Sequence, residues 1–420
     1  PALAKALSSA VSDRTQQQET LIDGTWALAH LDSKYLTPNW AALQSEIRKC
    51  RSGIVFTLVA DRFPEERIPI TRILPRGDWQ NETGEIVQPA VLHFLPQPKK
   101  KEKLTRLDLA KWLVSDENPL TARHVMNRTW KQFFGTGLSN VLDDLGSQGE
   151  WPSHPLLLDW LADTFRSNGW KTKPMIKLMV MSHTYRQKAA VRNDLKDLDP
   201  YNRLLAQQSA RRLDAEFIRD NGLAISGLLS TDYIGGPSIF PYQPPGYYAA
   251  IQFPDRKYIT SSDKQRFRRG VYMHWQRTFL HPMLANFDAP SREECSADRL
   301  QSNTPLQALT QLNDKNSVEM ARALALILIS EAPEKTAASR ITLGFHRTLS
   351  RDPSTKEMES LTVFLDKQTK HYQEKPEDAK NLIDPISAAA TASGVPEQEL
   401  AAWIQLSRAL LNLHETITRY

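Results

Sequence analysis

Apolar residues recur at intervals of three and four along most of the chain after residue 105, and this spacing places them on one face of a helix. Near the C-terminus, Trp403, Leu406, Leu410 and Leu413 form one such apolar stripe. We expect a mostly α protein whose C-terminal third is a helical bundle. The spacing predicts helices at 107–113, 119–134, 155–165, 174–183, 200–229, 304–330, 335–350, 354–373 and 396–415, and helical spacing also occurs within residues 1–50.

Some of these helices carry specific local signals. Asn118 is a candidate cap for helix 119–134, and Pro119 stands in its first turn, where a missing N–H is tolerated. Gly135 follows the last turn, which is a common way for a helix to end. Helix 200–229 places Arg212 and Glu216 four residues apart, so we expect these two side chains to pair.

Outside the helices, two short runs rich in β-branched and apolar residues, 53–60 and 68–74, predict a small β element near residues 53–90. Residues 230–268 concentrate Pro, Gly and Tyr, and we expect a long irregular loop there because Gly and Pro interrupt regular ladders. Long ordered loops are often functional, so this loop is a candidate lid or binding rim. Residues 269–287 predict a short strand and then a turn at His281-Pro282.

A connector divides the chain near residue 100. Pro89, Pro96 and Pro98 prevent a helix from crossing it, and a lysine run follows at 99–103. We predict three parts: 1–99, the end of a preceding domain with helices, short strands and a linker; 100–330, the main helical domain; and 331–420, a C-terminal helical subdomain. The chain starts with neither an initiator methionine nor an apolar signal core, so we expect a fragment or a processed product.

Composition limits the classes of function. The chain has 420 residues, of which 40% are hydrophobic, and this is enough for two or three packed units. Its formal charge is +5, and the lysines of the connector supply much of the local excess. No aromatic-basic recognition motif accompanies them, so we predict a solvated linker and no nucleic-acid partner. No apolar run reaches about 18 residues, which argues against a membrane span.

The only two cysteines, Cys50 and Cys295, rule out a cysteine-rich metal site and a Cys-x-x-Cys-His haem attachment sequence. We therefore predict no cofactor in this segment. Any haem c belongs to a missing domain or to a partner chain. The two cysteines either pair or stay reduced, and we favour two free thiols buried as small hydrophobes.

Histidines and carboxylates form the first candidate site. We assign proton transfer to Glu150 and His154, because imidazole and carboxylate together can share a proton in acid-base catalysis. The same residue types can bind a metal, but no His-x-x-x-His or His-Glu-x-x-His spacing occurs, and we predict no metal site. Histidines that hydrogen-bond within helical packing are the alternative. The chain also lacks a Gly-x-Ser-x-Gly elbow and a Walker loop, which weighs against serine and nucleotide hydrolases.

Arginines and acids form the second candidate set. Guanidinium groups hold carboxylate, phosphate or sulfate through two parallel hydrogen bonds, so an unpaired cluster would suit an anionic substrate. Arginines that already have an internal carboxylate would instead be structural staples. We expect a staple for Arg212 and Glu216, and both alternatives stay open for the other arginines. The substrate-binding residues predicted from this set are Arg123, Asn127, Arg128, Arg186, Asp288 and Arg299.

Aromatic residues form the third candidate set. Flat rings stack on sugar faces, and the loop rich in Tyr, Pro and Gly is a reasonable platform for such contacts. Core packing explains most of the helical tryptophans equally well. We therefore assign Tyr242, Tyr247 and Tyr248 to substrate binding and leave the helical tryptophans to the core.

Many of these residues stand in motifs that occur together and in order. In the helical domain the motifs are Asn118-Pro119-Leu120, Asn127-Arg128, Gly149-Glu150, Ser153-His154-Pro155 and residues 182–187. Elsewhere they are residues 72–89, 211–216, Gly235-Gly236-Pro237, Phe287-Asp288, residues 304–309, Arg351-Asp352-Pro353 and Leu411-Asn412. This series resembles a domain family of unknown function from planctomycetes and related bacteria. The resemblance extends over residues 50–420, and His154 matches the family's Gly-Glu-x-Pro-Ser-His-Pro pattern.

The resemblance implies a cellular location and partner domains more than a specific activity. Members of the family usually follow a second uncharacterised domain and often a cytochrome c module, which implies an exported protein of the periplasm or cell envelope with these partners. We expect an extracytoplasmic domain of a cytochrome-linked assembly, with oxidoreductase chemistry on carbohydrate or another external substrate. The first alternative is a non-catalytic binding or scaffold module for glycan or for the cytochrome partner. The second is metal-dependent hydrolysis.

Overall fold

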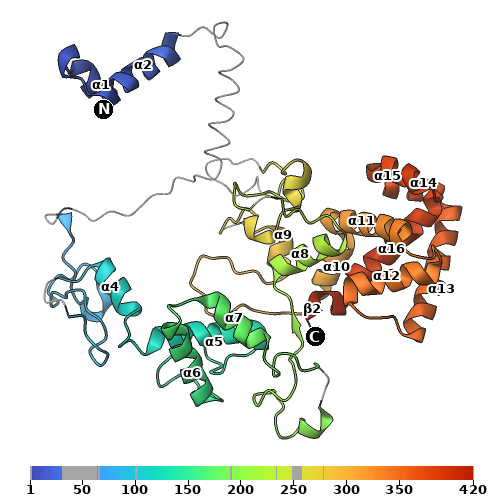
Figure 1. Ribbon diagram of the computed structural model, residues 1–420, viewed down its shortest axis with the longest axis horizontal. Helices are drawn as coiled ribbons and strands as arrows, with labels where there is room; N and C mark the ends of the chain where they lie inside the picture. The colour runs from blue at the N-terminus through green and yellow to red at the C-terminus, as the bar shows by residue number, and fades with distance from the viewer. Residues whose placement is uncertain are drawn as a thin grey trace. The chain divides into compact units, whose positions relative to one another are not determined.

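A computed structural model describes residues 2–30, 64, 67–99, 103–189, 192–232, 234–247, 258–277 and 279–419 (Figure 1). The chain divides into two compact units. One contains residues 1–62 and 233–237, and the other contains residues 63–232 and 238–420. The three-part division drawn from the sequence stays a prediction.

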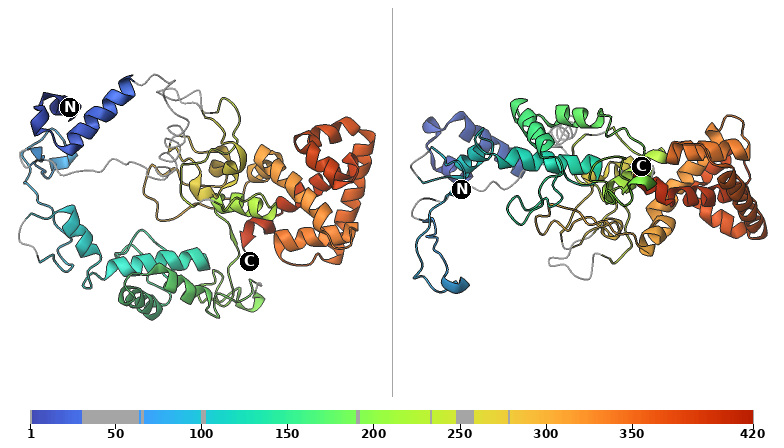
Figure 2. Two further views of the ribbon diagram at one scale, coloured as in Figure 1. Left: turned by 45° about the horizontal axis from the view of Figure 1, so that its top comes forward. Right: turned by 90° about the horizontal axis from the view of Figure 1, so that it is seen from below.

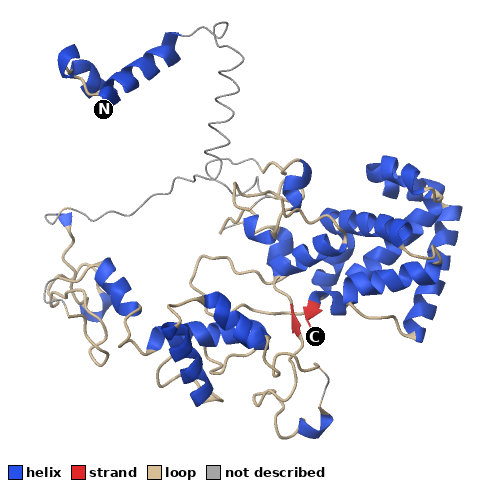
Figure 3. Ribbon diagram, in the orientation of Figure 1, coloured by secondary structure: helices blue, strands red, loops and turns tan. Residues whose placement is uncertain are grey.

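Helices supply most of the regular structure, as predicted (Figure 3). In the first unit, α1 (Ala2–Ser8) contacts α2 (Gln16–His30). In the described part of the second unit, the one sheet has two short antiparallel strands, β1 (Arg211–Arg212) and β2 (Thr418–Arg419). The fold is therefore mostly α. None of the described helices combines the length and the apolar character that a membrane crossing needs.

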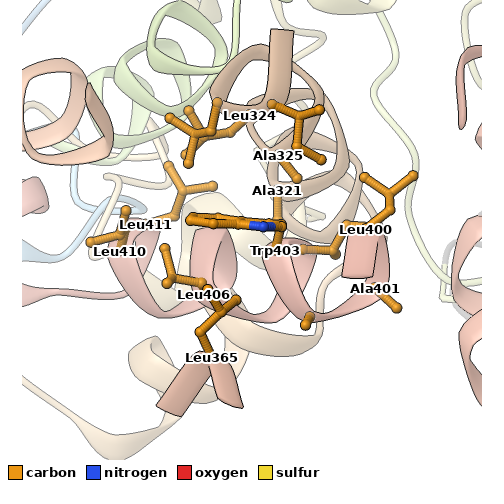
Figure 4. Close-up of a cluster of buried hydrophobic side chains, with 14 of the residues drawn as sticks. Ala321, Leu324, Ala325, Leu365, Leu400, Ala401, Trp403, Leu406, Leu410 and Leu411 are labelled. Atoms are coloured by element: carbon orange, nitrogen blue, oxygen red, sulfur yellow. The ribbon is translucent and has the colours of Figure 1, made fainter. Parts of the chain in front are cut away.

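The C-terminal bundle is built around α16 (Glu397–Leu411). The helices of this bundle that contact α16 are α10 (Pro305–Asn313), α11 (Lys315–Glu331), α12 (Ala337–Leu349), α13 (Thr355–Glu374) and α14 (Pro376–Ile383). Trp403 of α16 is only 1% exposed. Figure 4 shows its indole ring between Leu324 of α11 and Leu406 of α16. The predicted bundle is confirmed, and burial of its apolar stripe stabilises it by about 25 cal/mol per Å².

The boundaries inside the bundle differ from the predicted ones. Asp314 divides the predicted helix 304–330 into α10 and α11, because its backbone is extended and its carboxylate accepts a hydrogen bond from Asn316 N at 2.9 Å. The helix predicted to end at residue 415 ends at Leu411. Two further helices, α14 and α15 (Ser387–Ser393), were not predicted.

The predicted helix 200–229 is wrong over its first half. Only α8 (Ala215–Ile225) is helical, and Asp214 before it is extended. Arg211 and Arg212 form β1 instead, because their backbone groups pair with β2 at the other end of the chain. Leu213 N continues this pairing with a hydrogen bond to Ile417 O at 2.8 Å. The spacing of apolar residues within a short segment cannot reveal a strand partner about 200 residues away in the sequence.

In the described part of the second unit, four α-helices precede this strand: α4 (Arg106–Leu113), α5 (Leu120–Phe134), α6 (Pro155–Ser167) and α7 (Thr172–Val180). The last three contact one another, and Figures 1 and 2 show them grouped together in every view. Their shared core includes Met126, Trp130, Leu161, Met175 and Met179. The Oδ1 of Asn118 accepts a hydrogen bond from Leu120 N at 2.9 Å, which confirms the predicted cap.

A small β element precedes α4. Arg72 and Ile86 form an antiparallel bridge there, which is the described part of the predicted element near residues 53–90. The run 53–60 lies outside the described residues. A Cβ atom on Gly84 would lie 1.7 Å from Ile73 O, so glycine is required where the two segments meet.

The loop 230–268 is irregular where the structure describes it, as predicted, and contains one 3₁₀ helix, Asp263–Phe267. Ile239 pairs with Met273 in an isolated parallel bridge. The strand predicted after residue 269 is wrong, because the chain forms a 3₁₀ turn at Gly270–Tyr272 and makes only this bridge.

The predicted turn at His281-Pro282 is the start of a short helix, α9 (Pro282–Asn286). Pro282 occupies its first position, and His281 Nδ1 accepts a hydrogen bond from Met283 N at 3.3 Å. A turn signal and a helix start use the same residues here, because proline fits both.

Candidate functional site

The loop between α5 and α6 carries both predicted proton-transfer residues, and Asn127 holds its first turn. Asn127 is 2% exposed. Its Nδ2 donates to Ser139 O at 2.8 Å, and its Oδ1 accepts from Ser139 N at 3.0 Å. A Cβ atom on Gly137 would lie 2.3 Å from Ser139 O, so glycine is needed for this turn. Asn127, predicted to bind substrate, therefore uses its side-chain amide to hold the backbone of the loop that follows α5.

Glu150 lies at the other end of this loop and is held by Arg203. The Nη2 of Arg203 lies 3.3 Å from Glu150 Oε1 and donates to Leu138 O at 3.0 Å, while Nη1 donates to Gly137 O at 2.8 Å. The second carboxylate oxygen of Glu150 accepts from Asn140 N at 2.8 Å. Arg203 thus fastens both ends of the loop. Arg203 is not among the predicted site residues, because the apolar spacing places it inside the predicted helix 200–229.

His154 stands directly before α6, and its ring is half-buried. Its Nδ1 lies 3.0 Å from Ser153 Oγ, and that hydroxyl is 3.2 Å from Leu138 O. No described residue hydrogen-bonds to Nε2 of His154, and no described hydrogen bond joins His154 to Glu150. A cavity of about 10 Å³ lies beside Ser153 and Arg203, which is room for one water molecule at most.

The three predicted arginines of the helical domain divide into two kinds. Arg123 is a staple between α5 and α6, because its Nε donates to Asp159 Oδ1 at 2.6 Å and its Nη1 donates to Pro119 O at 2.8 Å. Arg128 and Arg186 are exposed, and neither side chain has an ion pair or hydrogen bond with a described residue. Burial, together with the nearby Arg128 charge, lowers the pKa of His124, so its imidazole favours the neutral form.

Asp288 and Arg299, both predicted to bind substrate, are internally paired. Asp288 Oδ2 accepts from Arg212 Nη2 and from Ser302 N, each at 2.7 Å. Burial alone would raise the pKa of Asp288, but the bonds from Ser302 and Arg212 outweigh it and hold that pKa below its usual value. Arg299 donates to Glu216 at 2.8 and 3.2 Å.

The predicted pair of Arg212 and Glu216 is therefore wrong in its partners, although each residue is a staple. Arg212 lies in β1 and Glu216 lies in the first turn of α8, so the helical spacing that would join them does not exist. Each residue reaches instead into the segment 288–302. Both bonds attach this exposed segment to the elements around β1.

Helix α8 holds a buried arginine. Arg219 of α8 is 6% exposed and donates to Arg268 O at 2.8 Å, and burial lowers its pKa to about 10. Its neighbour Asp220 accepts from Gly270 N at 2.7 Å, and burial raises the pKa of this carboxyl group. A cavity of about 40 Å³ lies beside Arg219, Asn221 and apolar side chains, far below the 300–1,000 Å³ of a typical ligand pocket.

Comparison with family models finds one match, over residues 105–365, which is more than half of the chain. The chain belongs to the PSD1 family. This family is described as a protein of unknown function (DUF1553). The match runs from the cap of α4 into α13 and contains every described candidate residue discussed so far. Curated proteins and solved structures show no match to the chain.

Several motifs of this PSD1 chain prove to be caps and staples. Thr304 and Gln307 form a capping box at the start of α10, and Gln307 also donates to Asn286 O at 2.9 Å. Arg351 donates to Glu357 of α13 and to Glu415, both at 2.8 Å or less from their nearer oxygens. Hydrogen bonds from Arg351 and Ser354 lower the pKa of Glu357 to about 2. These motif residues hold the fold together.

The tyrosines of the predicted rim have internal contacts. The ring of Tyr242 lies 4.5 Å from Lys315 Nζ, and its carbonyl oxygen accepts from Asn316 Nδ2 at 3.1 Å. Tyr247 is exposed, and its hydroxyl donates to Leu280 O at 3.2 Å. Tyr248 lies outside the described residues. Glycan stacking by these rings stays a prediction.

The remaining candidate residues of the PSD1 chain are the cysteines and the possible metal ligands. Cys295 is free and exposed, so the predicted burial of both thiols is wrong for Cys295, which lies in the segment 288–302. Cys50 lies outside the described residues. Across the described ranges, no three His, Cys, Asp or Glu side chains come together as metal ligands would.

Proposed function

We propose that this PSD1 chain is a binding or scaffold module that docks a protein partner, which was the non-catalytic alternative in the sequence analysis. The observation that carries this proposal is the surface of residues 67–117. None of the described residues in this segment is buried. Its exposed large apolar residues are Ile70, Ile73, Leu74, Trp79, Ile86, Val87, Leu92, Phe94, Leu107, Leu109, Leu113 and Val114.

Such exposure is unusual for a segment that stays in water. Trp79 is 77% exposed and Phe94 is 69% exposed. Full burial of one large apolar side chain stabilises an assembly by about 1.5–3 kcal/mol, and contiguous apolar surface on soluble proteins marks interaction sites. Covering a few of these side chains would supply a useful part of a binding free energy. We call residues 67–117 the apolar segment.

The polar residues also support docking over catalysis. An active site needs a cleft in which a base and an unpaired binding group converge. Glu150, Asp288 and Arg299 instead have internal ionic partners. Groups that are already satisfied stabilise the fold and have little capacity left for a substrate.

The partner that we propose is the upstream domain, with its cytochrome c module, that the family resemblance implies. In this proposal any haem c and any electron transfer belong to that partner, and the assembly is exported to the periplasm or cell envelope. The PSD1 chain contributes the docking surface.

Oxidoreductase chemistry on carbohydrate is a second candidate function, and one observation favours it. His154 Nε2 has no hydrogen-bonding partner among the described residues, and the exposed Arg128 and Arg186 side chains have none either. A substrate that brought these groups together would give His154 a proton to accept. The haem spectrum of the assembly, recorded with and without sugars and acidic glycans, tests this role, and His154→Ala should abolish any haem reduction that depends on it.

Hydrogen–deuterium exchange tests the docking role. The PSD1 chain is measured alone and with the upstream domain and cytochrome module added in trans. We expect the partner to slow exchange in the apolar segment. The double variant Trp79→Ser, Phe94→Ser should lose this protection and keep its thermal unfolding midpoint, because both side chains are exposed.

Val363→Ser is the matched control, since Val363 is also exposed but lies on α13, outside the apolar segment. It should leave the protection unchanged. Absence of protection in the apolar segment, or equal loss in the control, would refute the docking role.

A further inference from the structure

Helix α7 and the turns after it carry unpaired positive charge. The basic residues in this stretch are Lys171, Lys173, Lys177, Arg186 and Lys188, and residues 171–189 contain no Asp or Glu. All five side chains are exposed. None of them forms an ion pair with a described residue, although ion pairs are frequent in the rest of the second unit. The positive charge of this stretch is therefore available to a partner.

The position of α7 in the fold decides which side chains it presents. Met175 and Met179 are buried against α5 and α6. Since successive helix residues are 100° apart, Lys173 and Lys177 lie on the opposite side, and Leu178 lies at the edge of that side, between Lys177 and Met175. Leu178 is 42% exposed, and Met181, directly after the helix, is 60% exposed. We call Lys173, Lys177, Leu178 and Met181 the α7 face.

The charge arrangement on this face is unfavourable for the isolated fold. Lys173 lies in the first turn of α7, where the helix dipole already favours negative groups. Lys173 and Lys177 are four residues apart and repel each other. No acidic residue stands in the first turn to offset either effect. A negatively charged partner would offset both.

We propose that the α7 face docks an acidic protein surface with an apolar centre. This inference rests on the proposed function and names the chemistry of the partner at a second surface. Carboxylates on the partner would pair with Lys173 and Lys177. Its apolar centre would cover Leu178 and Met181. Met is enriched at protein interfaces, and complementary charge speeds and orients docking.

Other polyanions fit this face less well. A nucleic acid would be bound with aromatic side chains interleaved among the cations, and α7 has none. An anionic lipid surface requires a broad apolar helix face, but the Met175 and Met179 side of α7 is buried in the core. An acidic polysaccharide would satisfy the lysines and leave the two exposed apolar side chains uncovered.

Fluorescence anisotropy with the full chain tests the inference. The main probe is a synthetic amphipathic helix that carries Glu around a Leu face, and the comparison probes are its Lys-for-Glu counterpart, poly-L-glutamate, heparin and phosphatidylglycerol vesicles. We expect the acidic amphipathic peptide to bind more tightly than all of these. Its affinity should fall with added salt, because exposed charges are screened.

Two double variants separate the charged and apolar contributions. Lys173→Glu with Lys177→Glu should weaken binding about tenfold or more, and Leu178→Ser with Met181→Ser should weaken it about threefold to tenfold. The charge-reversal variant should stay folded, because Glu is favourable in the first turn of α7 and unfavourable in the last, so the two changes offset each other.

Lys367→Glu with Lys370→Glu on α13 is the control, because it changes the net charge by the same amount at two other exposed lysines. It should keep the affinity within about twofold. Equal weakening by the control, or tighter binding to poly-glutamate, heparin or vesicles than to the peptide, would overturn the inference. Protection of the apolar segment by the upstream partner is measured in a separate exchange experiment. If that protection is absent, the proposed function is contradicted. If it is present and the peptide does not bind as expected, only the inference about the α7 face fails.

Discussion

Replacing Asn127 with alanine should destabilise the protein strongly. Its amide makes two hydrogen bonds to the backbone of Ser139, at 2.8 and 3.0 Å, and it is 2% exposed. Asn127→Ala would leave a backbone N–H and a C=O buried without these partners. Each lost partner costs about 1–3 kcal/mol, so the two together should lower the free energy of unfolding by about 2–6 kcal/mol.

Urea unfolding followed by circular dichroism measures this loss. The matched control is Asn140→Ala, because Asn140 lies in the same loop and is exposed, and its change should stay within about 0.5 kcal/mol. Hydrogen–deuterium exchange should show faster exchange in residues 136–153 of Asn127→Ala, since the loop that carries Glu150 and His154 loses its first anchor. A loss below about 1 kcal/mol would refute the reasoning, because it would mean that water replaces the amide without difficulty.

Asn127→Asp separates hydrogen bonding from packing at the same site. A carboxylate can still accept from Ser139 N, but it would face the carbonyl oxygen of Ser139 with no proton to donate. Burial and this contact should raise the pKa of the new carboxyl group. The penalty should therefore be largest at neutral pH and shrink as the pH falls through that raised value. A penalty that is independent of pH would contradict this account.

Three further predictions follow from single contacts. Arg203→Met should lower the free energy of unfolding by about 1–3 kcal/mol and loosen the loop, measured by urea unfolding and by exchange, because two carbonyl bonds are lost. Glu357 has a folded pKa of about 2 against 4.5 unfolded, so its pairing with Arg351 stabilises the fold above pH 4.5 and is lost as the pH falls toward 2. After allowance for solvent screening, the unsubstituted protein should have a free energy of unfolding about 1 kcal/mol higher than that of Glu357→Gln at pH 7. This difference should vanish in acid, and unfolding measured across the pH range checks it. Gly84→Ala should break the bridge near Ile73, seen as faster exchange there, since its Cβ has no space.

Local signals sufficed for most of the helices. The cap at Asn118, the glycine at the end of α5 and the apolar stripe of α16 are decided within a few residues of the chain, so the sequence predicts them. The same spacing failed between residues 200 and 214. There the backbone pairs with β2 at the far end of the chain, and that pairing overrides any local preference.

The candidate site shows the same limit in its partners. The sequence singled out Glu150 as a motif residue, and in the structure its carboxylate pairs with Arg203. Its partner Arg203 lies more than fifty positions away in the chain, with a predicted helix around it, so no spacing rule joins the two. Arg212 likewise pairs with Asp288 instead of Glu216, because β1 replaced the helix that would have aligned them.

By itself, the sequence determined the mostly α class, the C-terminal bundle, the helix caps and the family, since these depend on local periodicity and on fixed motifs. The tertiary structure decided which polar residues are already paired and which apolar and basic ones stay exposed. This difference has a physical reason. Helix formation is governed by side chains three and four positions apart, whereas an arginine finds its carboxylate through contacts that only the packed chain creates. The exposed apolar segment and the α7 face became visible only when those contacts were known.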